Sequence, residues 1–287
     1  MKDANEKMRE VFGHELALLI GDVTRTDEIR LRRGSRVFVR RYGRNVPLDK
    51  VTESEEFDRI IDRMCKGSYY TCSEYIKEGY IPLGDGYRAG VCGRAVCDGN
   101  IIKGVYPIES ITVRIPHLIR GIAGQPGKLA EKGKNLLIYA PPGEGKTTFL
   151  RDIALTLCEA PLYRRVSLID SRCELALPEA EGATLMCVYS AYPKDKAAQY
   201  ALRSMSPDYI ISDEISCEDE AKALLSCQRA GVCVIATAHA NSHRDVMSRP
   251  ILRSLIEAGT FDFAVGIKRG DVYGKFDFEV TKVSCDA

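Results

Sequence analysis

The chain has 287 residues, of which 45% are hydrophobic and 28% are charged. This composition is typical of a soluble globular protein and excludes a disordered or fibrous chain. Lysine and arginine total 41 while aspartate and glutamate total 40, so the formal net charge is +1 and any electrostatic partner must be sought in local clusters. The length favours about two domains.

The 11 cysteines contain no Cys-x-x-Cys pair, which argues against a zinc site or a thioredoxin-like motif. We expect them to be reduced thiols in a cytoplasmic protein. The N-terminal stretch MKDANEKMREVF is too charged for the apolar region of a signal peptide, and no apolar run approaches the ~18 residues that span a bilayer. Any contact with a membrane is therefore expected from one side or through partners.

The first half of the chain mixes helical and strand patterns. Apolar residues at helical spacing predict a helix over residues 8–20. Alternating apolar residues and arginines predict two strands within 28–41, with a turn at Gly34, and a helix is expected over 50–78. Asp-Gly pairs at 85–86 and 98–99 separate apolar runs, which is the strongest short-range signal for hairpins.

These patterns predict a smaller α+β domain with an antiparallel sheet over residues 1–118. Residues 119–134 are rich in Gly, Lys and Pro and are expected to be a linker. Over 135–287, short apolar runs alternate with helical patterns, which is typical of βαβ units. We therefore predict an α/β domain with a mostly parallel sheet, closed by a hairpin near the C-terminus.

Residues 140–148, APPGEGKTT, lie between an apolar strand and a helix, which is the context that a P-loop requires. Glycines let backbone N–H groups turn onto phosphate oxygens, and the helix adds the positive end of its dipole. Ala140 replaces the first glycine of the usual loop, which is tolerable if its φ is negative. We predict ATP as the ligand, with Mg²⁺ held by Thr147. The expected contacts are Pro142, Gly143, Glu144, Gly145, Lys146, Thr147 and Thr148.

Residues 209–215, YIISDEI, read as a buried strand that ends in two acids. Carboxylates at the end of a buried strand destabilise the fold unless a ligand or a partner group compensates their charge. We expect Asp213 to hold Mg²⁺ and Glu214 to be the general base for the attacking water.

Two further strand ends carry candidate residues. The strand VCVIATAHA ends in Thr237 and His239, which we expect near the γ-phosphate, although a packed histidine without a catalytic role is the alternative. The stretch SLIDSRCEL adds Asp170, Arg172 and Glu174 at an edge where α/β sheets bind ligands, and a local salt-bridge cluster is the alternative there.

Residues 25–44 contain eight arginines and no lysine, against Asp27 and Glu28 alone. Arginine favours bidentate contacts to phosphate or carboxylate. Three interpretations stay open: binding of lipid or nucleic-acid phosphates, supply of arginines to the nucleotide of a neighbouring subunit, and a solvated strand face. Our candidates for the second are Arg30, Arg32, Arg40 and Arg41.

The stretches DEIRLRRGSRV, EGYIPLGDGYRAGVCGRAV and APPGEGKTT, followed by ALRSMSPDYIISDEI and ATAHA, resemble a known family. The second half is similar to the RecA-like ATPases of type II and type IV secretion, and the whole chain resembles the stage III sporulation protein AA family of endospore-forming bacteria. The resemblance implies a P-loop ATPase, an acidic box with Asp170 and Glu174, a histidine box with His239, and a site role for Arg203.

The resemblance also implies partners. It predicts a homo-oligomer, expected to be a hexameric ring, that serves a secretion-like transmembrane channel from the inner face of the mother-cell membrane. A RecA-like ATPase acting on nucleic acid ranks lower, because the second half shows no basic and aromatic path. A nucleotide-gated scaffold without catalysis is the third interpretation, against which Glu214 argues.

Overall fold

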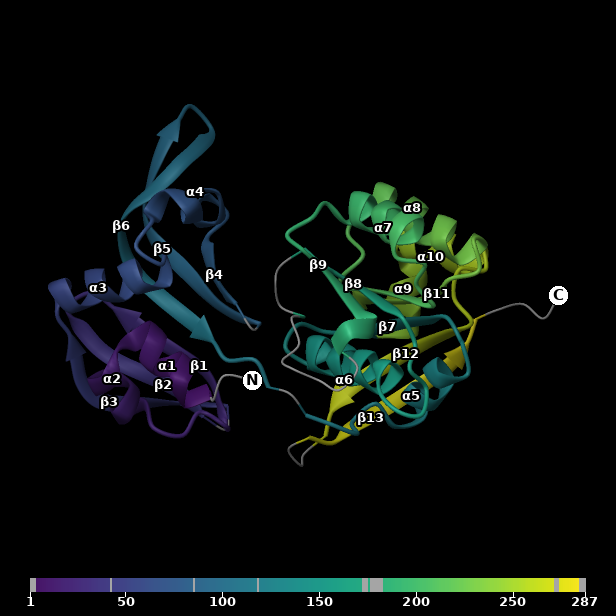
Figure 1. Cartoon of the computed structure of the whole chain (residues 1–287), viewed down its shortest axis with the longest axis horizontal. Helices are drawn as coiled ribbons and strands as arrows, with labels where there is room; N and C mark the ends of the chain where they lie inside the picture. Colours follow the sequence, from purple (N-terminus) through teal and green to yellow (C-terminus); the bar gives the residue numbers. More distant parts are fainter. Residues whose placement is uncertain are drawn as a thin grey trace. The chain divides into compact units, whose positions relative to one another are not determined.

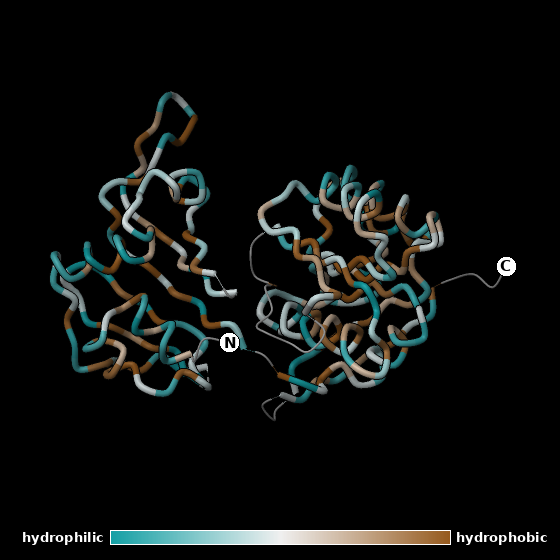
Figure 2. Tube along the Cα trace, in the orientation of Figure 1, coloured by the Kyte–Doolittle hydropathy of each residue, from teal (hydrophilic) through white to brown (hydrophobic). Residues whose placement is uncertain are grey.

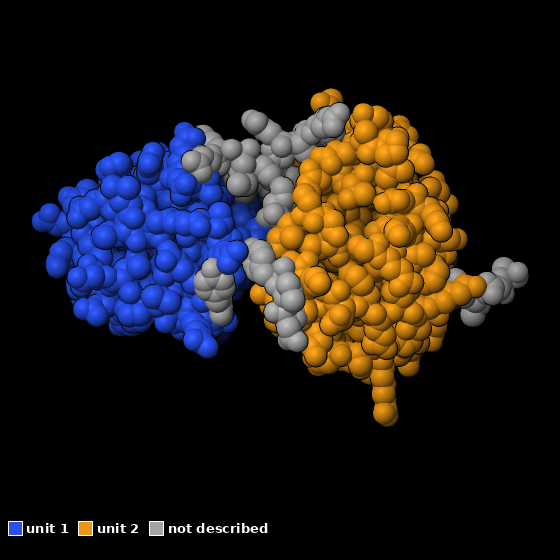
Figure 3. Space-filling model, turned by 90° about the horizontal axis from the view of Figure 1, so that it is seen from below, with its two compact units in different colours: residues 1–117 blue, residues 118–287 orange. Residues whose placement is uncertain are grey.

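The computed structural model describes residues 4–41, 43–84, 86–117, 119–171, 175, 183–270 and 274–283 (Figure 1). The chain divides into two compact units, residues 1–117 and 118–287, which Figure 3 shows in different colours. Among the described residues, no helix is both long and apolar enough to cross a membrane. The nine cysteines within the described ranges are all free thiols.

The first unit is a six-stranded antiparallel sheet in the order β3-β2-β1-β6-β5-β4. Its strands are β1 (Thr26–Arg32), β2 (Ser35–Arg41), β3 (Arg44–Thr52), β4 (Tyr80–Gly84), β5 (Tyr87–Asp98) and β6 (Ile101–Arg114). Its helices are α1 (Ala4–Phe12), α2 (His14–Ile20), α3 (Ser54–Met64) and α4 (Tyr69–Lys77). The antiparallel sheet and both hairpins therefore agree with the sequence prediction.

The described helices of this unit pack on one face of the sheet, where they share a single core with it. In α3, the residues Phe57, Ile60, Ile61 and Met64 follow the helical repeat and are buried. They join one core with the inward residues of β1 and β2, namely Ile29, Leu31, Val37 and Val39. The arginines that alternate with these residues are exposed on the other face.

Three local predictions differ from the structure. The helix expected over 8–20 is interrupted at Gly13, whose φ of 83° is open to glycine. Residues 50–52, at the start of the helix expected over 50–78, instead belong to the end of β3. β3 lies at the edge of the sheet, where Pro47 can be accommodated because its missing N–H is not needed to pair with a further strand. Residues 119–134 are not an irregular connection, because they contain α5 (Gly124–Glu131), whose Ala130 lies in the core of the second unit.

The second unit confirms the predicted fold class, a mostly parallel α/β sheet, with strand order β13-β12-β7-β11-β10-β8-β9. All neighbours are parallel except the terminal hairpin of β12 and β13. The strands are β7 (Leu136–Ala140), β8 (Val166–Asp170), β9 (Met186–Ser190), β10 (Tyr209–Ser212), β11 (Cys233–His239), β12 (Phe263–Arg269) and β13 (Phe276–Lys282).

The remaining helices form two layers around this sheet. They are α6 (Lys146–Cys158), α7 (Lys194–Ser204), α8 (Glu218–Arg229), α9 (His243–Ser248) and α10 (Pro250–Glu257), with a 3₁₀ turn at Ala183–Leu185. Alternate residues of β7 face opposite layers: Leu137 packs in the cluster that contains α7, α8 and α10, whereas Ile138 packs in the cluster with α5 and α6. In Figure 2, brown segments, which mark hydrophobic residues, lie along these buried strands.

An ion pair joins the amino ends of two central strands. Asp208, directly before β10, accepts hydrogen bonds from Arg165, directly before β8: its Oδ2 lies 2.8 Å from the backbone N and 3.2 Å from Nε, and its Oδ1 lies 2.8 Å from Nη2. The side-chain hydrogen bond from Arg165 is the largest of the causes that lower the pKa of Asp208. A carboxylate with a depressed pKa stabilises the fold above its unfolded-state pKa, and this stabilisation is lost as the pH falls through the folded-state value.

We predict that Asp208→Asn lowers the thermal unfolding midpoint by a few degrees at neutral pH, because the charge-assisted hydrogen bonds are weakened. The difference from the wild type should shrink below about pH 4, where the carboxyl group becomes protonated in the unfolded chain. Asp219→Asn is the matched control, since Asp219 is 80% exposed and forms only a long ion pair, of 3.8 Å, with Lys222. A deficit of the same size at pH 7 and pH 3 would contradict this assignment.

Candidate functional site

The candidate site lies where four parallel strands end. β7, β11, β10 and β8 are neighbours in the sheet, so their carboxyl ends meet at one edge. The register places His239 of β11 opposite Ala140 of β7. Ligands of open α/β sheets bind at this kind of edge. The topology therefore brings together the loop after β7, the acids after β10 and the end of β11.

The loop between β7 and α6 has the backbone of a phosphate cradle. Gly143 and Gly145 have φ angles of 85° and 90°, and Gly145 caps α6 in the left-handed conformation. A Cβ on Gly145 would approach the Phe276 ring to 2.9 Å, so a larger residue here would also have to displace this ring. Ala140 ends β7 and is not among the residues with positive φ, which meets the condition for its replacing a glycine.

The loop is held from the side by β12. The backbone N–H of Arg269 donates to Oε2 of Glu144 at 2.8 Å. Within the loop, Pro142 and Gly143 are exposed, whereas Thr147 and Thr148, in the first turn of α6, are half-buried. Backbone N–H groups at this helix end have no partner within the helix, which makes it suited to an anion.

Lys146 is the first residue of α6 and is only 9% exposed. Its Nζ donates to the main-chain oxygens of Ala140 (2.8 Å) and Pro141 (3.1 Å) and lies 2.8 Å from Nδ1 of His239. Burial lowers the pKa of this ammonium to about 8, opposed by the carboxylates of Glu214 and Glu144. The charged form is therefore only partly compensated by the protein, and an anion placed here would favour it.

His239 connects the loop lysine to Glu214. An ammonium can only donate, so Nδ1 of His239 accepts from Lys146 and the ring proton lies on Nε2. Nε2 is 3.4 Å from Oε2 of Glu214, whose side chain is 25% exposed. His239 thus lies between the loop lysine and the carboxylate after β10.

The second acid, Asp213, is paired with a lysine that the sequence analysis did not select. Nζ of Lys194 lies 2.8 Å from Oδ1 of Asp213, and it also donates to the main-chain oxygen of Glu214. The Lys194 side chain is 9% exposed. A lysine in the first turn of a helix opposes the helix dipole, and this was the one signal in the sequence that could have identified it.

The other expected residues are placed as follows. Thr237 is buried in β11, with its carbonyl oxygen accepting from the N–H of Ile215 at 2.9 Å. Asp170 ends β8, is fully buried and accepts from the N–H of Leu175 at 2.8 Å. Arg172 and Glu174 lie outside the described residues.

Arg203 is not brought to the phosphate loop of its own chain, which differs from the expectation. It lies in the exposed last turn of α7, which leads to the amino end of β10. The phosphate loop is at the carboxyl end of the sheet, so a strand length of about 15 Å separates the two edges. Any contact of Arg203 with a nucleotide would have to be made to another subunit.

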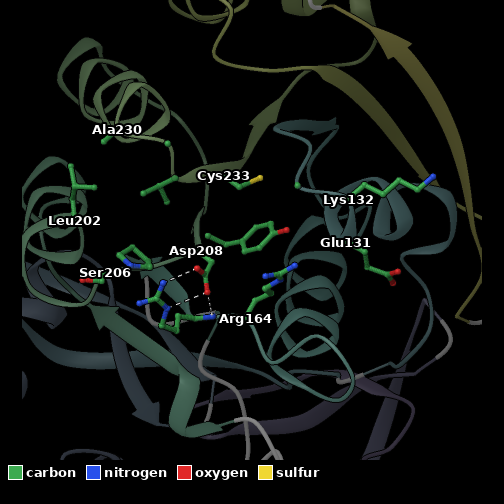
Figure 4. A pocket seen from close by; sticks show the side chains of 14 residues that line it. Glu131, Lys132, Arg164, Leu202, Ser206, Asp208, Ala230 and Cys233 are labelled. Carbon is green, nitrogen blue, oxygen red and sulfur yellow. Dashed lines mark hydrogen bonds and ion pairs between the residues drawn. The ribbon is translucent and has the colours of Figure 1, made fainter.

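A separate cavity of about 790 Å³ opens at this amino edge (Figure 4). Loops before β7, β8, β10 and β11 form its walls, and the Arg165–Asp208 pair lies in it. None of the expected nucleotide-binding residues lines this cavity. It is therefore distinct from the strand-end site.

No group of three or more His, Cys, Asp or Glu residues in the described part of the chain could hold a metal ion. In phosphate-transfer sites, Mg²⁺ takes one or two protein ligands together with phosphate oxygens and water. The oxygens of Thr147 and Asp213 are of the type that Mg²⁺ prefers.

Residues 4–279 match the family described as Sporulation stage III, protein AA. Stage III sporulation protein AA of Bacillus subtilis (strain 168) is 34% identical over 253 residues, which cover 85% of this chain and 82% of that protein. The Holliday junction branch migration ATPase PINA of Sulfolobus acidocaldarius is 29% identical over 162 residues, which cover 54% of this chain and 29% of PINA.

Among solved structures, the pilus retraction motor PilT with bound ADP is similar, with a TM-score of 0.66 at 16% sequence identity. The superposition covers 95% of this chain and 83% of the PilT chain. At this identity the likeness shows the fold alone, which resembles that of the PilT motor.

Proposed function

The chain belongs to the Sporulation stage III, protein AA family, as its motifs predicted, and on this premise we propose that it is a P-loop ATPase. Its role would be that of a motor or assembly ATPase for a secretion-like channel apparatus in endospore formation. The observation that supports this most is the set of strand-end contacts from Lys146 through His239 to Glu214, beside a loop with the backbone of a phosphate cradle.

Phosphate binding follows from the loop and from Lys146. The N–H groups of residues 143–148 and the start of α6 offer donors and positive potential to the β- and γ-phosphates of ATP. Lys146 would exchange its contacts to the Ala140 and Pro141 carbonyls for phosphate oxygens, which are stronger partners for an ammonium. Pro142, Gly143, Glu144, Gly145 and Thr148 would shape this cradle.

Thr147 and Asp213 are the residues that would hold Mg²⁺. Bound there, the metal would supply charge neutralisation between the β- and γ-phosphates. Thr147 would contribute its hydroxyl from the first turn of α6, and Asp213 its carboxylate from the end of β10.

Glu214 is proposed to accept the proton of the attacking water. Its carboxylate is only partly exposed, and the Nε2–H of His239 orients it from one side. Thr237, in the neighbouring strand, would place its hydroxyl near the reacting phosphate. Asp170, at the end of β8, would keep its carboxylate at this edge of the sheet, where it accepts from the N–H of Leu175.

The proposal extends to the assembly. We expect a homo-oligomeric, hexameric ring on the cytoplasmic side of the mother-cell membrane, in contact with membrane proteins of the channel. Arg203 and the exposed arginines of the first unit are the groups that this ring would bring to a neighbouring nucleotide.

A second candidate function is an ATPase that acts on nucleic acid. A similarity to PINA over 162 residues favours it, although the match covers only 29% of PINA. ATP turnover measured with and without DNA or RNA distinguishes the two, because only the second candidate predicts stimulation. A scaffold that binds ATP without hydrolysing it would show no turnover under any condition.

Lys146→Ala should reduce ATP affinity about 100-fold or more, since charge-assisted contacts to two phosphates are lost. Isothermal calorimetry measures this directly. Lys132→Ala is the matched control, because Lys132 is an exposed lysine of the same unit at the opposite edge of the sheet. Equal affinities of wild type and Lys146→Ala would refute the P-loop assignment.

Glu214→Gln should bind ATP normally but hydrolyse it at least ~100-fold more slowly, because the amide cannot accept a proton from water. Phosphate release under saturating ATP is the measurement. Glu218→Gln, at a glutamate that is 77% exposed, should leave turnover unchanged. A loss of less than tenfold in Glu214→Gln would mean that another group is the base.

Of the four arginines proposed to act on a neighbouring subunit, two already have partners within their own chain. Arg41 donates to Thr26 Oγ1 at 3.1 Å and to the carbonyl of Ile20, and Arg30 holds Glu28 at 2.7 Å, so both have structural partners. Arg32 and Arg40 are exposed and form no ion pair with a described residue.

Arg32→Glu/Arg40→Glu should keep the first unit folded, because the buried face of β1 and β2 is untouched. It should lower ATP turnover and ATP-dependent assembly together, since an arginine supplied from a neighbouring subunit accelerates phosphoryl transfer by ~10³ or more. Arg9→Glu/Arg59→Glu, on exposed helix positions, is the control. Normal turnover with lost binding to anionic vesicles would favour a lipid-binding face instead.

A further inference from the structure

Lys194 is a buried cation in a position that helix energetics disfavour. It starts α7, where the positive end of the helix dipole repels an ammonium. Its side chain is nevertheless 9% exposed, so its charge has been withdrawn from water. A buried charge persists only where partners compensate it, and these partners define its role.

Three oxygens surround this ammonium. Oδ1 of Asp213 lies 2.8 Å away, the main-chain oxygen of Glu214 accepts a hydrogen bond, and Oε1 of Glu220 lies at 4.0 Å. All three belong to the segment that runs from the end of β10 to the first turn of α8. Lys194 therefore holds both acids after β10, Asp213 by its carboxylate and Glu214 by its backbone.

Glu220 is itself fixed to this segment. Its carboxylate accepts from the backbone N of Ser216 at 2.7 Å and from the Ser216 hydroxyl at 3.0 Å. The side chains of Asp213 and Glu220 are 16% and 15% exposed. Two partly buried carboxylates thus share one lysine, which has a second acceptor available if Asp213 takes another partner.

We propose that Lys194 is a positioning residue that competes with a divalent cation for the Asp213 carboxylate. An ammonium 2.8 Å from this oxygen repels a second cation, so Asp213 is a poor metal ligand until negative charge arrives with a nucleotide. Lys194 then turns toward Glu220 and releases Asp213 to the metal. Metal binding at Asp213 is thereby confined to the metal–nucleotide complex.

This inference rests on the proposed function, because it assumes that Asp213 faces the metal of a bound nucleotide. Its distinctive consequence is nevertheless independent of ATP. Removal of the Lys194 charge should create an affinity for divalent metal at Asp213 in protein prepared without nucleotide.

The experiment is a Mn²⁺ titration of nucleotide-free protein followed by electron paramagnetic resonance. Lys194→Gln keeps a donor for the Glu214 carbonyl but removes the charge, and it should bind Mn²⁺ about tenfold or more tightly than the wild type. Lys194→Arg should restore the wild-type affinity. Lys196→Gln is the matched control, since Lys196 is 55% exposed on the same helix and contacts Asp195 at 3.5 Å.

The added affinity must belong to Asp213, so Lys194→Gln/Asp213→Asn should lose it. If Lys194→Gln does not fold because two acids lose the charge of their shared lysine, Lys194→Gln/Glu220→Gln removes one of these acids and should show the same gain. Unchanged Mn²⁺ affinity in the folded variant, or a gain that survives Asp213→Asn, would overturn the inference.

Calorimetry of ATP binding on the same proteins separates this inference from the proposed function. Lost ATP binding in the wild type would refute the P-loop proposal whatever the Mn²⁺ result. Normal ATP binding with no Mn²⁺ gain in Lys194→Gln would leave the ATPase proposal standing and refute only the role of Lys194.

Discussion

Two carboxylates at the end of a fully buried strand have to be compensated, and most of the site follows from this constraint. β10 is buried throughout, and Asp213 and Glu214 leave it at the edge of the sheet. Lys194 from α7 compensates the first acid, and His239 from β11 faces the second. Lys146 completes the set through His239. Each partner comes from a different element, so the phosphate loop, β11 and α7 all make contacts that converge on these two acids.

These contacts would connect ligand binding at the site to the positions of the surrounding helices. Lys146 is bonded to two main-chain oxygens and to His239, so a phosphate that attracts its ammonium also changes the contact that reaches Glu214. On the other side, a metal that attracts Asp213 changes the contact that holds α7. In the proposed function, phosphate and metal would act through these contacts on α6 and α7, whereas the sheet between the helices is packed on both faces.

The first unit has a different kind of constraint. Its sheet buries one face under helices and leaves the other to arginines, with Glu28 shared between Arg30 and Arg114 at 2.7 and 3.9 Å. Like charges along neighbouring strands are tolerated because they are exposed to water, and an anionic partner would be favoured at this face. Short apolar strands on the buried face supply stability independently of those arginines, so the face can serve a partner without supporting the fold.

The sequence by itself determined the fold class and the hairpins, and it predicted the phosphate loop and the two acids as site residues. These features depend on local chemistry: alternation of apolar residues, Asp-Gly turns, and glycines before a Lys-Thr helix start. Edge strand β3 was missed because Pro47 and the charged residues of this strand hide the strand pattern. The single helix expected over 8–20 was divided by a glycine with positive φ.

Only the tertiary structure decided which charged groups meet. Lys194 carries no motif, and its pairing with Asp213 follows from the tertiary structure, in which the start of α7 lies beside the end of β10. Arg203, nine residues along the same helix, was carried to the opposite edge of the sheet. The physical reason is that pairing between residues distant in sequence depends on strand order and helix direction, which local residue patterns do not encode.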